Sequence, residues 1–180
     1  PAIHPKLHTC VAYACGPLVV LWDWSEGRKY FLQGHTKTVT AFSYSPCGVY
    51  LISADSIEFI TWDLATGAIQ TRHEYGAVLE RTSDSGVQCR DDVTVVSMDF
   101  NDNGKILTTL EVGSSGLCTV QCWKWRDGFR ELCFARPPLG RGYTFIRSSH
   151  DGRDIVVCAP EVLVGYRVIV PVLTAMAEVL

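Results

Sequence analysis

Few residues of this 180-residue chain have the types and spacing that enzymatic or metal chemistry requires. His35 has no second histidine or carboxylate at the spacing of metal ligands, which disfavours a metal site. The sequence contains no glycine-rich phosphate loop and no Gly-x-Ser-x-Gly nucleophile motif, and the adjacent Asp91 and Asp92 fit a solvated loop better than a paired acid–base site. We therefore expect no enzymatic activity, no metal and no cofactor.

The eight cysteines are numerous but form no Cys-x-x-Cys pair. Cys118 and Cys122 alternate onto one face of an expected strand, where they could approach each other. Small buried thiols in a reducing compartment nevertheless explain the set better than a zinc site does. A catalytic thiolate would also need an adjacent histidine or a helix N-terminus, and no long helix is indicated. These features favour a cytoplasmic or cytoskeletal protein.

Composition narrows the possible functions further. The chain is 47% hydrophobic and 19% charged, which is ordinary for a globular protein with a sizeable core. Its net charge of −3 provides no general attraction to nucleic acid or to an anionic membrane. The apolar run near the C-terminus is interrupted by Tyr166, Arg167 and Pro171 and is shorter than the roughly 20 residues that span a bilayer. We expect no membrane partner.

The elements that would position His35 lie between residues 39 and 73. Alternating β-branched and aromatic residues predict strands that are separated by turn residues, and the Ser45-Pro46-Cys47-Gly48 turn cannot lie inside a strand ladder because proline lacks a donor. The strands are expected at Val39–Tyr44, Val49–Ala54, Glu58–Asp63 and Ala68–His73. The pattern predicts a four-stranded antiparallel meander.

Gly34-His35 before the first of these strands and Trp62-Asp63 at the end of the third resemble the signature of a WD-repeat β-propeller blade. Trp22-Asp23 lies 40 residues before Trp62-Asp63, so the pattern repeats. The resemblance implies an all-β fold of WD40-type propeller blades, each a four-stranded antiparallel sheet. Because three and a half blades cannot close one of the larger rings, it also implies a fragment of a larger propeller.

The repeat divides the chain into parts of one propeller. Trp123 stands where Trp62 stands in the earlier repeat, and Glu111–Gly116 is expected to be a long turn. Whether residues 170–180 form a fourth strand or a tail is left open. The expected parts are a partial blade without its first strand at 1–33, the WD blade at 34–73, an inserted loop at 74–92, a blade at 93–135, and a degenerate or incomplete blade at 136–180.

The resemblance also implies a structural role for His35. A buried imidazole can bond a hydroxyl on the second strand, for which Ser53 is the candidate, and continue to an acidic turn residue and to the indole of Trp62. Either Asp55 or Ser56 could take the acidic position, because this turn is tighter than the usual form in the family. We favour this structural role over a ligand-binding or catalytic one.

A closer resemblance links the chain to the cilia- and flagella-associated WD-repeat proteins of the axoneme. Two expected third strands end in Trp-x-Trp, as Trp22-Asp23-Trp24 and as Trp123-Lys124-Trp125. This resemblance implies a non-enzymatic scaffold of a cytoskeletal or ciliary complex that associates with microtubules. Its partners would be other proteins of a large assembly, with tubulin or dynein-associated subunits among them. It would be located in the cytoplasm, at the cytoskeleton, or in the axoneme of a cilium or flagellum.

Three alternatives remain beside the axonemal scaffold. The chain could be an adaptor in another cytosolic or nuclear complex. It could be a propeller enzyme, but the expected starts of the first strands offer only one carboxylate, Asp92. It could bind nucleic acid through a locally basic segment, although interspersed acidic residues make a solvated face the simpler interpretation. The arginines of that segment are Arg126, Arg130, Arg136, Arg141, Arg147 and Arg153.

The longest departures from the minimal repeat indicate where partners would bind. In a propeller, residues 74–92, residues 111–116 and the connector at 136–142 would emerge on the same face. Loops that exceed the usual short connections are often functional, although tolerated insertions are the alternative. We expect a protein-binding site on this face, with Arg81, Arg136 and Arg141 making charged contacts.

Overall fold

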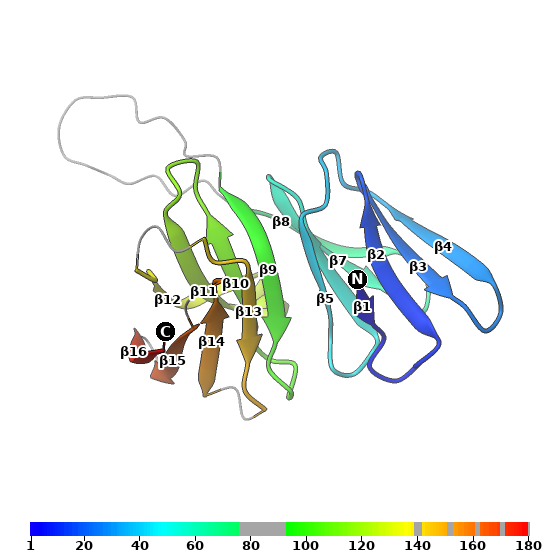
Figure 1. Cartoon of the computed structure of the whole chain (residues 1–180). Coiled ribbons are helices and arrows are strands. Elements are labelled where there is room, and N and C mark those ends of the chain that lie inside the picture. The colour runs from blue at the N-terminus through cyan, green and yellow to red at the C-terminus, as the bar shows by residue number, and fades with distance from the viewer. Residues whose placement is uncertain (76–92, 139–141, 151–152, 161–162, 170–171, 180) are drawn as a thin grey trace.

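The computed structural model describes residues 1–75, 93–138, 142–150, 153–160, 163–169 and 172–179. These residues form four antiparallel sheets of four strands each, and each sheet is connected in chain order (Figure 1). The first blade contains β1 (Ala2–Ile3), β2 (Cys10–Cys15), β3 (Leu18–Asp23) and β4 (Arg28–Gln33). The second contains β5 (Ala41–Tyr44), β6 (Tyr50–Ala54), β7 (Glu58–Asp63) and β8 (Ile69–Glu74). The third contains β9 (Thr94–Phe100), β10 (Leu107–Val112), β11 (Cys118–Lys124) and β12 (Arg130–Ala135). The fourth contains β13 (Phe145–Ser148), β14 (Asp154–Cys158), β15 (Leu163–Ile169) and β16 (Val172–Val179).

The two faces of each sheet pack against different neighbours. Because side chains alternate along a strand, Trp62 and Phe59 of β7 point to opposite faces. Trp62 joins a core with residues of the first blade such as Val19, whereas Phe59 joins a core with residues of the third blade such as Val95. In the third and fourth blades Trp123 and Tyr166 likewise pack on the blade before them. The face with the aromatic residue at the Trp62 position therefore packs on the preceding blade.

The first strands connect the blades along the inner side of the array (Figure 1). β5 contacts β9, and β9 contacts β13. Between β9 and β13 the backbone N–H of Ser148 donates to the Asp99 carboxylate at 2.8 Å, and that of Ile146 donates to the Ser97 hydroxyl at 3.2 Å. These bonds satisfy polar groups at the junction of the third and fourth blades.

The predicted fold class is confirmed: the described chain consists of four-stranded antiparallel blades of the WD40 type. The strand boundaries of the third blade differ from the expected ones at two places that matter for the site. Glu111 lies inside β10 and the reversal is confined to residues 113–116, because the Gly116 N–H bonds the Gly113 carbonyl at 2.9 Å in a tight turn. The expected third strand also ends one residue early, since Trp125 begins a 3₁₀ turn that runs to Asp127.

Strands complete the blades at both ends of the array. The first blade was predicted without its first strand, but the two-residue β1 pairs with β2 through Ala2 with Ala12 and Ile3 with Val11. In the fourth blade, β16 pairs with β15, so residues 172–179 form a strand and not a tail. Within the described residues, no helix is both long enough and apolar enough to cross a bilayer.

Candidate functional site

The structure places His35, Ser53, Asp55 and Trp62 in one buried hydrogen-bond network of the second blade. The Trp62 indole N–H donates to Ser53 Oγ at 2.7 Å, and Ser53 Oγ lies 2.6 Å from His35 Nε2. His35 Nδ1 lies 2.9 Å from Asp55 Oδ2. A carboxylate only accepts, so Nδ1 donates to Asp55, and Nε2 of the neutral ring accepts the Ser53 hydroxyl proton.

Asp55 completes this network at the turn between β6 and β7. Its Oδ1 accepts the backbone N–H groups of Ile57 at 2.7 Å and Glu58 at 2.9 Å. The acidic position that the sequence left open between two residues is therefore taken by Asp55, while Ser56 is exposed. Tyr75 adds a bond from its hydroxyl to the Asp55 carbonyl. The Asp55 carboxylate thus holds both the backbone of the turn and the imidazole of His35 in place.

Burial determines the charge states in the network. Burial lowers the pKa of His35, even though the hydrogen bond and the charge of Asp55 act in the opposite direction. For Asp55, burial alone would raise the pKa, but bonds from the Glu58 and Ile57 backbone and from His35 outweigh it, so the net pKa is lowered. A neutral imidazole beside an ionised carboxylate is consistent with both shifts.

Ser53, His35 and Asp55 are the residue types of a hydrolase triad, and their bonds run in the triad order. The environment prevents that chemistry here. The side chains of His35 and Asp55 are fully inaccessible, and Ser53 is completely buried. Trp62 also donates to the Ser53 oxygen that would attack a substrate. The arrangement can hold β6, β7 and the residues before β5 together, but no substrate carbonyl can reach Ser53.

His35, Asp55 and Glu58 also bring one potential metal ligand atom each within 4.8 Å of one another. These atoms already have partners in the protein. His35 and Asp55 bond each other, and the Glu58 carboxylate pairs with the Arg72 guanidinium. The charges of this cluster are therefore compensated by the chain's own residues.

The third blade contains a related network that the sequence analysis missed. The Trp123 indole donates to Thr109 Oγ1 at 2.9 Å, and the Thr109 hydroxyl donates to Glu111 Oε1 at 2.8 Å. Thr109 and Glu111 follow Gly104 at the same distances at which Ser53 and Asp55 follow Gly48, so counting from the turn glycine could have found them. The sequence analysis counted Glu111 as the start of a long turn instead.

Glu111 differs from Asp55 in its environment. It is buried within β10, and burial raises its pKa to about 7, against the hydrogen bond from Thr109 and with a further contribution from the charge of Glu131. Asp55 accepts two backbone N–H groups and the imidazole N–H of His35, whereas Glu111 accepts the hydroxyl of Thr109. The network of the third blade therefore contains a carboxyl group that titrates near neutral pH.

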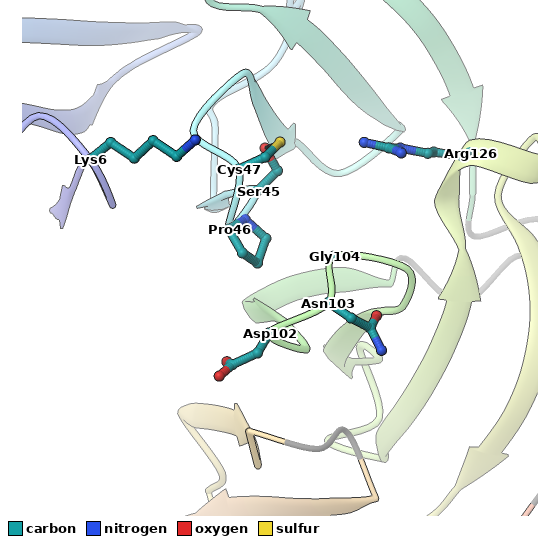
Figure 2. A pocket seen from close by; sticks show the side chains of 8 residues that line it. All are labelled: Lys6, Ser45, Pro46, Cys47, Asp102, Asn103, Gly104 and Arg126. Carbon is teal, nitrogen blue, oxygen red and sulfur yellow. Dashed lines mark hydrogen bonds between the residues drawn. The ribbon is translucent and has the colours of Figure 1, made fainter.

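Residues that the structure describes line two of the hollows between the blades. One, of about 650 Å³, is lined by the first strands of all four blades on the inner side of the array, and Asp99 and Arg147 are the charged residues of its lining. Arg147 lies 3.7 Å from the Asp99 carboxylate. The other, of about 310 Å³, lies where the first turns of three blades meet (Figure 2).

Of the three arginines predicted to contact partners, the structure describes Arg136 alone. Arg136 is exposed just after β12. Arg81 and Arg141 lie outside the described residues, as do residues 76–92 of the expected loop. Tyr75, the last described residue before them, is buried. In the basic segment, Arg130 pairs with Asp127 at 3.0 Å.

Comparisons with known proteins agree with the blade architecture. No protein-family model matches the chain. U3 small nucleolar RNA-associated protein 21 of Saccharomyces cerevisiae is 32% identical over 102 residues, which are 56% of this chain and 9% of that protein. Transcription initiation factor TFIID subunit 5 of Caenorhabditis elegans is 34% identical over 64 residues, which are 34% of this chain and 10% of that protein.

The matched segments thus span about a tenth of each relative's length. Both relatives are WD-repeat proteins. The four-stranded blades, the packing of each Trp62-type face on the preceding blade, and these two relatives together support placing the chain with the WD-repeat β-propeller proteins.

Proposed function

We propose that the chain is a non-enzymatic protein-interaction scaffold of a multiprotein assembly. The observation that carries this proposal is the sealed Ser53, His35 and Asp55 network. The side chains best suited to catalysis hold a blade together and have no access to solvent. The WD-repeat relatives support the same general role, because a rigid array of blades presents turns to other proteins.

For the assembly itself we propose a cytoskeletal, ciliary complex of the axoneme, with tubulin or dynein-associated subunits among its partners. This proposal rests on the two Trp-x-Trp strand ends and on the glycine-containing repeat of the third blade. It places the protein in the cytoplasm, at the cytoskeleton. Arg81, Arg136 and Arg141 remain the proposed charged contacts of the loop-bearing face.

A second candidate is an adaptor in another cytosolic or nuclear complex. The names of the two relatives favour it, because one is a small nucleolar RNA-associated protein and the other a transcription initiation factor subunit. Direct binding of nucleic acid has less support. Arg130 and Arg147 of the basic segment lie next to Asp127 and Asp99, which reduces the positive charge available to phosphates.

The two assemblies can be separated by tagging the full-length protein in ciliated cells and determining its location and its co-purifying proteins. Enrichment in the axoneme together with tubulin or dynein subunits would support the first candidate. A nuclear location with a discrete set of other proteins would support the second. Both candidates would be overturned if the protein had no protein partner and bound nucleic acid with an affinity that falls steeply as the salt concentration rises.

A further inference from the structure

The smaller hollow is built by turns from three successive blades, and we call it the turn pocket. Lys6 comes from the turn between β1 and β2, and Cys47 from the turn between β5 and β6. Asn103 comes from the turn between β9 and β10, and Arg126 from the 3₁₀ turn after β11. The remaining lining residues are Ser45, Pro46, Asp102 and Gly104.

Lys6 and Arg126 give the turn pocket positive charge. Figure 2 shows their side chains extending toward the Cys47 turn from opposite sides. The Arg126 guanidinium lies 4.8 Å from the centre of the Trp125 ring and 5.7 Å from that of Tyr50. These rings hold the guanidinium in place but do not neutralise it. No ion pair of Lys6 or Arg126 occurs within the part of the chain that the structure describes.

The acidic residue of the lining is directed elsewhere. The Asp102 carboxylate pairs with Nδ1 of His150 in the turn after β13, and in Figure 2 it points away from Cys47 and Arg126. The Asn103 side-chain oxygen accepts the Lys105 backbone N–H at 2.9 Å. The two cations therefore remain available to an anion.

Cys47 lies between these cations. Its Sγ is 3.2 Å from Ser45 Oγ. Burial would raise the pKa of the Cys47 thiol, but hydrogen bonds from Ser45 and the Val49 backbone, with the charge of Arg126, outweigh burial and lower it. Negative charge on the sulfur is thus favoured in this environment, as expected beside an unpaired guanidinium.

We propose that the turn pocket binds one carboxylate, supplied by a Glu or Asp side chain of a protein partner, between Lys6 and Arg126. This inference rests on the proposed scaffold function and names the chemistry of a partner. A planar guanidinium held by two rings has the geometry for bidentate binding of a carboxylate. A nucleic-acid backbone fits less well, because a run of phosphates needs a series of cations and the lining of the pocket contains two, Lys6 and Arg126.

Cys47 allows the carboxylate site to be tested without knowing the partner. The full chain is treated separately with iodoacetate, which has a carboxylate, and with iodoacetamide, its neutral analogue. In both reactions the thiolate sulfur attacks the methylene carbon, a C–S bond forms, the C–I bond breaks and iodide leaves. Mass spectrometry gives the alkylation rate at each cysteine, and the ratio of the two rates cancels effects of thiol pKa and exposure.

We expect the iodoacetate to iodoacetamide rate ratio to be about five- to tenfold higher at Cys47 than at the exposed Cys15, the attraction expected from a nearby charge in water. The variants Lys6→Gln and Arg126→Gln should each lower the ratio at Cys47 toward that at Cys15. The matched variant Lys29→Gln removes an exposed lysine of the first blade and should leave it unchanged.

Equal ratios at Cys47 and Cys15, a ratio at Cys47 that Arg126→Gln does not lower, or no alkylation of Cys47 by either reagent would overturn the carboxylate site. Lys6 and Arg126 are exposed, so these substitutions should not prevent folding. The scaffold function is judged separately by co-purification of partners. A chain that fails the alkylation test but retains its partners loses the turn pocket as a binding site and keeps the proposed function.

Discussion

At the scale of single residues, burial decides what Ser53, His35 and Asp55 do. The same three side-chain types would make a nucleophile, a base and an orienting acid if a substrate could reach the hydroxyl. Trp62 occupies the serine oxygen, and the network is inaccessible. A buried hydrogen-bond network in which every member is paired stabilises one conformation of the chain. The role of His35 is therefore expected to appear in stability measurements and not in turnover.

Replacing His35 by alanine should lower the free energy of unfolding by about 1–3 kcal/mol, because Ser53 and Asp55 each lose a buried partner. Urea unfolding of the full chain measures this change. The matched control is His150→Ala, which removes an exposed histidine and should change stability much less. A His35→Ala variant as stable as the parent protein would show that the network does not stabilise the blade.

Glu111 should make the stability of the chain depend on pH. Its pKa is about 7 in the folded protein against an ordinary 4.5, so between these pH values it takes up a proton on folding. The contribution is fully present below pH 4.5 and is lost as the pH rises through about 7. At pH 8, Glu111→Gln should therefore be more stable than the parent by about 3 kcal/mol, and near pH 4 the two should be similar.

Urea unfolding of both proteins from pH 4 to pH 8 tests whether the stability contribution of Glu111 decreases as the pH rises. Glu26→Gln is the control, since Glu26 is exposed beside Arg28 and its replacement should leave the pH dependence as it was. A stability difference between Glu111→Gln and the parent that stays constant from pH 4 to pH 8 would contradict the assigned protonation of Glu111.

At the scale of elements, the first turn of the second blade also links it to the first blade. Gly48 has a left-handed φ of 71°, and a Cβ there would lie 2.6 Å from Cε1 of the His4 ring. His4 Nδ1 accepts the backbone N–H groups of Lys6 and Leu7, so its Nε2 donates to the Gly48 carbonyl, at 2.9 Å. The second blade is thereby joined to the turn of the first.

Gly48→Ala should destabilise the chain more than Gly67→Ala does. Both glycines have φ of 71°, so both substitutions incur the cost of a left-handed residue, about 1–2 kcal/mol. At Gly67 a Cβ would meet only Leu32, at 3.9 Å, whereas at Gly48 it would collide with His4. The difference between the two melting temperatures measures the interblade contact. Equal losses would show that His4 moves away without cost.

Sequence reasoning predicted the elements well wherever turn residues and strand alternation agreed. Gly48 and Trp62 located the second blade, and all its four strands were expected within two residues of their observed ends. It failed at Glu111, because a carboxylate two residues before the Gly113–Gly116 segment has the local composition of a turn. In the structure this residue pairs with Thr119 of β11 and with Val95 of β9, so it belongs to a strand. The turn pocket could not be predicted either, since its lining comes from three separate blades.

At the scale of the whole molecule, the blades are held together by large side chains between sheets. Phe129 is buried and stacks on Phe59 and on His73 of the second blade, with ring centres 5.1 Å away in each case. It has a left-handed φ of 56° directly after Gly128 at 64°. A non-glycine residue in this conformation is strained, so the packing between blades must exceed that cost.

Phe129→Ala should lower the free energy of unfolding by about 3–5 kcal/mol, the usual loss when a buried phenylalanine is truncated. Phe134→Ala, at an exposed position of β12, is the control and should cost far less. Thermal and urea unfolding of both variants would measure the difference. Similar stabilities for the two would show that Phe129 does not anchor the third blade on the second.

The central claim, that the protein works by binding other proteins, is tested most directly by the composition and mass of its native complex. The tagged full-length protein would be isolated under native conditions and its complex separated by size. The molecular mass of the complex would then be measured and its components quantified by mass spectrometry. We predict a complex that contains other proteins in fixed stoichiometry with the tagged chain. Recovery of the protein alone, at the mass of a single chain and without any stoichiometric partner, would contradict the scaffold function.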